Sequence, residues 1–333
     1  MAKVAQLAPS GIRPLTRTEE YLALLRDLKP NRKNGLTAVD GWAGAGGLSL
    51  GFEAAGFAVT GYERDADACE TYTRNLKGDC HQVTIDDETE FQACDVFVAG
   101  PPCQPFSVIG QQRGRTDSRD GFPAFVSAVK RLRPRAWLFE NVPNILGRHQ
   151  EYLDELVGRL ERLGYYATPF IISAADCGVP QARRRLVVVG TKTPFELPPL
   201  PGVSVSAGVA LGGLASRVLD ASLHLTSSQL AYIRRYEEKS KCAPRDLHLD
   251  RPARTLTCRN LGGSTSDMQR ILLPDGRRRR LTVAEAARLQ SFPTGFKFSG
   301  SSISQMAQVG NAVPPLVSLW LAKAVANHLL PAQ

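Results

Sequence analysis

Residues 36–51 read LTAVDGWAGAGGLSLG. The first six residues are mostly apolar and predict a short buried strand, after which glycines crowd a turn that opens a helix reaching to about residue 55. A second strand is expected at residues 57–63 and ends on Glu63. Glycines at such a turn let the backbone approach a ligand closely. The stretch therefore predicts the first strand–helix–strand unit of an α/β sheet, with a ligand at its glycine turn.

The alternation of strands and helices continues as far as residue 190. Further strands are expected at residues 94–100, 136–140 and 186–190, and helices at 66–75, 123–132 and 150–163. This order predicts a mostly parallel sheet with helices on both faces. After residue 190 the pattern becomes irregular, with four prolines between 194 and 201. We expect an N-terminal tail and helix (1–35), a main domain (36–190 plus 305–333) and a small irregular domain (191–304), with 305–330 forming a loop and a long helix.

Composition narrows the class of protein. The chain has 333 residues, 43% of them hydrophobic, and a formal net charge of +9, which favours a polyanionic partner. Its seven cysteines form no C-x-x-C pair and are odd in number, so we expect no metal site and no disulfide framework. We find no apolar run of membrane-spanning length and no secretory signal. These features predict a cytoplasmic, monomeric protein that does not bind membranes.

The octapeptide GPPCQPFS, residues 100–107, suggests the chemistry. It holds Cys103 in a proline-flanked turn after the apolar run at 96–99, where a parallel sheet binds its ligands. A thiol attacks as its thiolate, so this position suits a covalent nucleophile. Glu140 ends the next strand and Arg183 to Arg185 form a cationic cluster. An acid and cations beside a thiol indicate covalent chemistry on an electron-poor ring.

The glycine turn alone permits another interpretation. Glu63 lies about twenty residues beyond it, the spacing at which a carboxylate binds ribose hydroxyls in dinucleotide sites. A nicotinamide-dependent dehydrogenase would account for the glycines but would leave the octapeptide around Cys103 unexplained.

Six segments, in this order, resemble the DNA (cytosine-5) methyltransferases. They are residues 40–47, Glu63, 101–104, 140–142, 181–185 and 310–314, and the resemblance spans about 36–325. It implies a Rossmann-like sheet that uses S-adenosyl-L-methionine, with residues 191–304 as a small target-recognition domain. It also implies that the enzyme methylates carbon 5 of a cytosine flipped out of double-stranded DNA.

The resemblance assigns cofactor contacts to residues from several segments. These are Trp42, Ala43, Gly44, Gly46, Gly47, Glu63, Pro102, Asn311 and Val313, with Glu63 holding the ribose hydroxyls. The family usually has Phe where this chain has Trp42. Asp86 is our candidate for the contact with the adenine amino group, and Asp79 and Asp87 are open alternatives.

The implied mechanism assigns a role to each residue around the thiol. Cys103 would bond to carbon 6 of the ring, which makes carbon 5 reactive. Glu140 would protonate or hydrogen-bond ring N3, for which we expect burial to raise its pKa. Arg185, with Arg183, would donate to O2 and to nearby phosphates, while Arg184 should point the other way.

The DNA contacts are expected in two places. Residues 104–119 resemble the family's mobile catalytic loop and offer Gln104, Ser107, Gln111 and Arg113. The basic run 277–280, and Arg280 in particular, would add phosphate affinity. Two alternatives stay open: the same chemistry on tRNA, and a catalytically inactive binding protein, against which intact Cys103, Glu140 and Arg185 argue.

Overall fold

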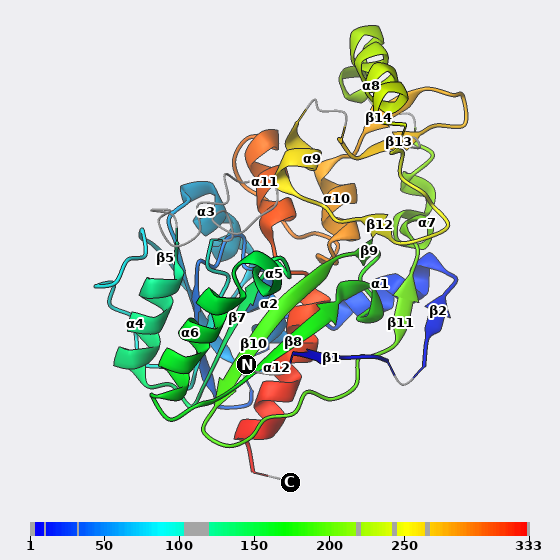
Figure 1. The fold of residues 1–333 in the computed structure, drawn as a ribbon. Coiled ribbons are helices and arrows are strands. Elements are labelled where there is room, and N and C mark those ends of the chain that lie inside the picture. The colour runs from blue at the N-terminus through cyan, green and yellow to red at the C-terminus, as the bar shows by residue number, and fades with distance from the viewer. Residues whose placement is uncertain are drawn as a thin grey trace.

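The computed structural model has an eight-stranded sheet at its centre (Figure 1). It describes residues 4–9, 11–31, 33–102, 120–217, 221–241, 245–263 and 267–331. The strands of this sheet are β1 (Ala5–Gln6), β3 (Thr37–Gly41), β4 (Ala58–Glu63), β5 (Cys80–Gln82), β6 (Val96–Ala99), β7 (Ala136–Asn141), β8 (Tyr166–Ser173) and β10 (Arg184–Thr191). Across the sheet they lie in the order β1, β8, β10, β7, β6, β3, β4, β5.

The expected α/β sheet is confirmed, with one difference in direction. β10 runs antiparallel to both of its neighbours, β7 and β8, and the other pairings are parallel. The five strands expected from residue 36 onward correspond to β3, β4, β6, β7 and β10. β8 was not expected from the sequence, because Pro169 interrupts its strand pattern. Because β8 and β10 pair over eight residues, they form an antiparallel hairpin that brings residues 181–185 to the edge of the sheet where β7 ends.

Helices cover both faces of the sheet, as expected. They include α2 (Gly47–Ala54), α3 (Ala66–Asn75), α4 (Phe122–Leu132), α6 (Gln150–Glu161) and α12 (Pro315–Leu329). The side chains of β6 alternate between two hydrophobic clusters, one on each face of the sheet. Val96 and Val98 belong to the cluster that contains residues of α2 and α12, whereas Phe97 belongs to the cluster that contains residues of α4 and α6. Successive residues of a strand point to opposite faces, so this fully apolar strand is buried on both.

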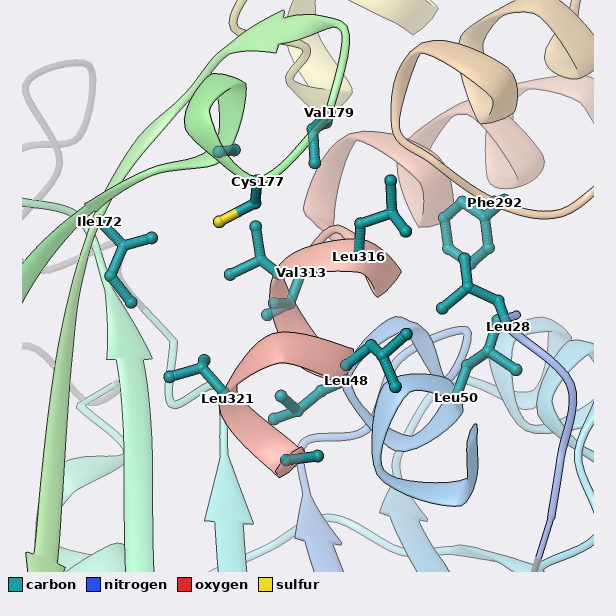
Figure 2. Packing of buried hydrophobic residues seen from close by; sticks show 14 of the residues in the cluster. Leu28, Leu48, Leu50, Ile172, Cys177, Val179, Phe292, Val313, Leu316 and Leu321 are labelled. Atoms are coloured by element: carbon teal, nitrogen blue, oxygen red, sulfur yellow. The ribbon is translucent and has the colours of Figure 1, made fainter. Parts of the chain in front are cut away.

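Glycines let α12 dock directly on α2. A Cβ atom on Gly51 would lie 2.3 Å from the backbone nitrogen of Leu319, and one on Gly47 would lie 2.4 Å from the carbonyl oxygen of Val313. Figure 2 shows Leu48 of α2 and Leu316 of α12 in the cluster that this contact creates. The C-terminal segment is thereby held against the helix that follows the glycine turn.

The C-terminal segment differs from the expected loop and single helix. It forms α11 (Ser302–Asn311) and then α12, with Pro314 capping the second helix. The stretch Ser302–Leu329 is long and apolar enough to cross a membrane, but 72% of its most apolar window is buried within the fold. Its packing identifies it as a core element of the protein.

The irregular region after β10 contains more regular structure than its sequence suggested. Its elements are β11 (Val203–Val205), α7 (Ala207–Leu211), α8 (Ser227–Ser240), β12 (Ala253–Arg254), α9 (Cys258–Gly262), β13 (Arg270–Leu272), β14 (Arg278–Arg280) and α10 (Val283–Leu289). Three elements from elsewhere in the chain join them: β2 (Arg13–Leu15) pairs with β11, β9 (Gln181–Ala182) pairs with β12, and α1 (Thr18–Arg26) packs on α7. The short helix α5 (Ile145–Arg148) lies in the main part of the chain and packs on α6. Much of this region shares the main core, and Leu225, Ile233 and Met268 form a separate cluster under α8. The division at 190/191 and 304/305 stays a prediction.

Candidate active site

The turn after β6 is anchored to the ends of β3 and β7. The Gly100 amide donates to the Gly41 carbonyl at 3.3 Å, and the Asn141 side-chain amide donates to the Pro101 carbonyl at 3.3 Å. Asn141 is buried and also accepts a hydrogen bond from the Val142 amide at 2.8 Å. The chain is therefore fixed at the point where it leads into Cys103. Cys103 itself, with Gln104, Ser107, Gln111 and Arg113, lies outside the described residues.

Glu140 and Arg185 meet at the end of β7. Arg185 Nε lies 2.6 Å from Glu140 Oε1, and their side chains are 16% and 14% exposed. Within the described part of the chain, Oε1 receives no well-aligned hydrogen bond, and it is buried. The contact is thus an ion pair that holds the two groups together and leaves this oxygen able to accept a better-aligned donor.

Arg183 and Arg184 take different positions from Arg185. Arg184 is exposed, as expected. Arg183 is 3% exposed, and its Nη1 donates to the carbonyl oxygens of Leu256 at 2.9 Å and Gly310 at 3.4 Å. Its guanidinium therefore lies inside the protein, where it links the segments around residues 183, 256 and 310. This position does not suit the expected contact with a base or phosphate.

The glycine turn and Glu63 form a second edge of the site. Glu63 Oε2 accepts a hydrogen bond from the Gly44 amide at 2.8 Å, and Oε1 accepts from the amides of Arg64 and Asp65 at 2.8 and 2.9 Å. Gly44 and Gly46 have positive φ angles of 55° and 84°, which favour glycine. A Cβ atom on Gly44 would meet none of the described residues within 4 Å, so with respect to them the turn faces open space beside a carboxylate. This arrangement fits an adenosyl ligand.

Trp42 and Pro102 are brought together by a residue that the sequence analysis missed. A Cβ atom on Gly121 would lie 2.7 Å from Pro102 Cδ and 3.1 Å from Trp42 Cζ2. The turn that leads to the thiol and the glycine turn are thus neighbours, as the mechanism implied by the resemblance requires. The only sequence signal was a glycine immediately before a helix.

Asn311 and Val313 approach the same edge from the C-terminal segment. The Val313 carbonyl lies against Gly47, and Asn311 is exposed at the end of α11. Ala43 and Gly47 are buried in the turn itself. The expected cofactor residues from residues 42–63, 102 and 311–313 therefore gather at one end of the sheet.

Asp40 is a buried acid that sequence analysis left without a role. Its Oδ2 accepts a hydrogen bond from the Ser49 hydroxyl at 2.6 Å, and its Oδ1 has no partner among the described residues. Burial raises the pKa of Asp40 from its ordinary value of 3.8 to about 7. The side chain links β3 to the first turns of α2 and so supports the glycine turn from below.

The three candidates for the adenine contact lie in different places. Asp86 is exposed, and its carboxylate accepts hydrogen bonds from the Thr89 hydroxyl and the Glu88 amide, which lower its pKa. It lines an open pocket with Tyr62, whereas Asp79 precedes β5 and so lies at the strand end opposite Glu63. Asp87 is exposed beside Asp86. Asp86 stays our candidate, and its carboxylate would have to leave its own turn to bind a ligand.

The basic run at 277–280 is largely neutralised. Arg279 is fully buried and forms a two-point ion pair with Glu285 at 2.7 and 2.8 Å. Arg278 pairs with Asp246, and Arg277 with Asp275. Arg280 is half-buried and also has a partner. The run as a whole is therefore not the free phosphate-binding cluster that we expected.

Known proteins resemble this chain along most of its length. The family profile described as C-5 cytosine-specific DNA methylase matches residues 36–207 and 234–327. The Type II methyltransferase M.AplI of Arthrospira platensis is 51% identical over 312 residues, covering 92% of this chain and 90% of the relative. M1.HphI of Haemophilus parahaemolyticus, also a Type II methyltransferase, is 34% identical and covers 87% and 86%.

Solved structures share the fold at lower identity. The Entamoeba histolytica methyltransferase EhMeth has a TM-score of 0.68 and 17% identity, covering 89% of this chain and 99% of that one. The S. pombe Dnmt2 methyltransferase has a TM-score of 0.67 and 16% identity, covering 89% and 100%. These two likenesses concern the fold alone. The profile match and the identity to M.AplI show that the chain belongs to the C-5 cytosine-specific DNA methylase family and is a DNA cytosine-5 methyltransferase.

Proposed function

We propose that this enzyme transfers a methyl group from S-adenosyl-L-methionine to carbon 5 of a cytosine flipped out of duplex DNA, through a transient bond between Cys103 and carbon 6. The ion pair of Glu140 and Arg185, 2.6 Å apart beside the turn that Asn141 anchors, carries the proposal. An acid and a guanidinium so placed suit the N3 and O2 atoms of a pyrimidine.

The cofactor would be held by the glycine turn, Glu63 and the C-terminal segment. Glu63 would exchange the amide of Gly44 for ribose hydroxyls, and Trp42 would pack on the adenine ring. Asn311 and Val313 would close the site from the opposite side. When bound, S-adenosyl-L-methionine supplies an electrophilic methyl group on a positively charged sulfur.

The protein's own residues would then activate the ring. The Cys103 thiolate adds to carbon 6 while Glu140 delivers a proton, or a strong hydrogen bond, to N3, so that the electrons of the ring move toward carbon 5. Arg185 donates to O2 and keeps Glu140 in place. Arg183 acts as a positioning residue, since it is buried and its Nη1 donates to the Leu256 and Gly310 carbonyls. After methylation, loss of the carbon 5 proton and departure of the Cys103 sulfur restore the aromatic ring.

The substrate and setting follow from the same site. The target must leave the base stack, because carbon 6 is attacked above the ring plane, and this costs a few kcal/mol. The catalytic-loop residues Gln104, Ser107, Gln111 and Arg113, with Arg280, stay our candidates for nucleic-acid contact. We propose a cytoplasmic, DNA-associated monomer that acts as a Type II modification methyltransferase, as its relatives are named.

Labelled cofactor and a mechanism-based substrate test this proposal. The wild-type enzyme should transfer radiolabelled methyl to duplex DNA, and Cys103→Ala should not. Duplex DNA with 5-fluorocytosine at the target should leave a stable adduct, because fluorine at carbon 5 cannot depart as a proton does. Label in tRNA alone would favour the RNA alternative, bound cofactor without transfer would favour an inactive binding protein, and turnover without any adduct would exclude the covalent route.

A further inference from the structure

Residues 253–256, which lead into the short helix α9, are hydrogen-bonded to the segment before Arg185 at the catalytic edge of the sheet. β12 pairs in parallel with β9, and the Leu256 amide donates to Gln181 Oε1 at 2.9 Å. Arg183 Nη1 donates to the Leu256 carbonyl at 2.9 Å, and Arg185 follows two residues later in the same strand region. Leu256 is therefore hydrogen-bonded to Gln181 and Arg183, which lead into Arg185, and α9 starts two residues after Leu256.

The same helix lies against the C-terminal segment. A Cβ atom on Gly310 would fall 2.3 Å from the Cys258 backbone nitrogen, so α11 and the first turn of α9 touch backbone to backbone. Figure 1 shows α9 beside α11. The residue after Gly310 is Asn311, one of the expected cofactor contacts. The first turn of α9 thus borders both the catalytic edge and the cofactor edge.

Local hydrogen bonds fix this turn and decide which side chains it exposes. Thr257 Oγ1 accepts from the Asn260 amide at 3.2 Å, and Asn260 Oδ1 accepts from the Thr257 amide at 2.9 Å. This reciprocal cap buries Asn260 and leaves Cys258 and Arg259 exposed. The two exposed side chains therefore stand on a backbone that is already ordered before any ligand binds.

Arg259 differs from three arginines of the neighbouring segments, Arg245, Arg254 and Arg270, which are paired with acids. Asp267, close to α9 in sequence, is held by Arg245 and Arg254 at 2.5 and 2.9 Å. Within the described ranges, Arg259 makes no ion pair and no side-chain hydrogen bond, although the buried Arg270 pairs with Glu237 and Asp246. An exposed guanidinium without an acid partner has its five donors free for a ligand.

An apolar side chain completes the surface. Ile303, in the first turn of α11, is 69% exposed, and its Cγ2 lies 3.9 Å from where a Cβ atom of Gly262 would be. It therefore stands next to the end of α9. A cation beside an exposed aliphatic group suits the edge of a DNA duplex, where acceptor atoms and apolar groups alternate.

We propose that Cys258, Arg259 and Ile303 form a DNA-contacting surface beside the extruded cytosine, and that Arg259 makes its principal polar contact. The inference rests on the proposed function and adds to it a specificity-determining residue. The acceptors that Arg259 would meet are the O6 and N7 atoms of a guanine, or phosphate oxygens, and the experiments below separate these two.

The first experiment uses the exposed thiol as a reporter. Cys103→Ala enzyme is treated with N-ethylmaleimide, with and without duplex DNA, and modification of Cys258 is followed by peptide mass spectrometry. Bound DNA should slow the modification of Cys258 at least tenfold. Arg162→Cys places a control thiol at the C-terminal end of α6, beyond the opposite end of the sheet, and DNA should not protect it.

The second experiment replaces the arginine in the complete enzyme. Arg259→Ala should weaken DNA binding roughly 5- to 150-fold, as loss of one bidentate contact does, with no change in cofactor affinity. Arg162→Ala is the matched control and should bind DNA as the wild type does. If Arg259 reads guanine, sequencing of methylated DNA will show relaxed specificity at one position; if it holds phosphate, affinity will fall equally for all sequences and the salt slope will decrease by about 1.

Two results would overturn the inference while leaving the proposed function intact. One is equal modification of Cys258 with and without DNA in an enzyme that binds DNA. The other is an Arg259→Ala enzyme whose DNA affinity and specificity match the wild type. Failure of the wild-type enzyme to methylate DNA would instead refute the proposed function.

Discussion

The buried pair of Arg279 and Glu285 offers a direct test of how the basic run should be interpreted. We consider Arg279→Met, which removes the cation, and Arg279→Met with Glu285→Leu, which removes both charges. Arg279 is 0% exposed and Glu285 2%, and two hydrogen bonds of 2.7 and 2.8 Å join them. Arg279 also donates to the carbonyl oxygens of Leu214 and Arg217 at 3.0 and 3.2 Å.

The two changes should differ greatly in their effect on folding. Removing one partner leaves a buried charge without compensation, which costs about 3–5 kcal/mol. Replacing both with apolar side chains of similar size removes the need to desolvate either charge and is often neutral or even stabilising. Here Glu285 also accepts from the Thr282 amide at 2.8 Å, and the carbonyls of Leu214 and Arg217 lose a donor, so a remaining loss of about 1–2 kcal/mol is expected.

Urea unfolding followed by circular dichroism measures both free energies, and DNA binding as a function of salt measures the phosphate role. We expect a large loss of stability for Arg279→Met, partial recovery in the double variant, and an unchanged salt slope in the double variant. If Arg279→Met were as stable as the wild type and its salt slope fell by about 1, Arg279 would be a phosphate ligand and the structural interpretation would be wrong.

Three further changes probe the site and its support. Asn141→Ala removes the donor to the Pro101 carbonyl and should lower kcat about tenfold to a hundredfold by loosening the turn before the nucleophile, with cofactor affinity unchanged; an unchanged kcat would contradict this. Asp40 has a pKa raised to about 7, so between about pH 4 and pH 7 the folded chain holds a proton that the unfolded chain has released, and stability falls as pH rises through that window. Asp40→Asn should remove this slope in urea unfolding and be the more stable protein above pH 7, whereas equal slopes would disprove the assignment. Gly51→Ala should destabilise the protein by roughly 1–3 kcal/mol by forcing α12 away. Gly213→Ala, whose added Cβ atom would meet none of the described residues within 4 Å, should be nearly neutral in thermal unfolding.

The sequence predicted the main sheet because hydrophobic runs and turn residues mark its strands. The run at 96–99 is apolar throughout, and a strand with that pattern has to be buried on both faces. β8 was missed because Pro169 interrupts its pattern. The proline is tolerated because β8 lies near the edge of the sheet, where only the two-residue strand β1 pairs with its outer side, opposite Phe170 and Ile171. The direction of β10 was also not predictable, because local patterns do not distinguish parallel from antiparallel pairing.

The role of a side chain could be predicted where it follows from the residue's place at the end of a strand. It could not be predicted where it depends on partners that the fold brings from elsewhere in the chain. Glu140 ends its strand, and its ion pair with Arg185 joins two residues already expected in one site. Arg183 and Arg279 looked as available as their neighbours in the sequence. Both are buried against hydrogen-bonding partners, carbonyl oxygens and a carboxylate, that lie between 6 and 127 residues away in the sequence. No local sequence pattern reveals these partners.

The segment around residues 310–313 explains how distant parts of the chain form one site. Gly310 touches the first turn of α9 and accepts from Arg183, while Val313 touches Gly47 at the cofactor turn. The last turn of α11 and the short connection to α12 therefore fix the spacing of the cofactor edge, the catalytic strand and the proposed DNA surface. Because each contact involves backbone atoms at glycine positions, a side chain added at Gly47 or Gly310 would force two of these parts to separate. Such a change should impair cofactor binding and DNA binding together, whereas the loss of Arg259 should affect DNA binding alone.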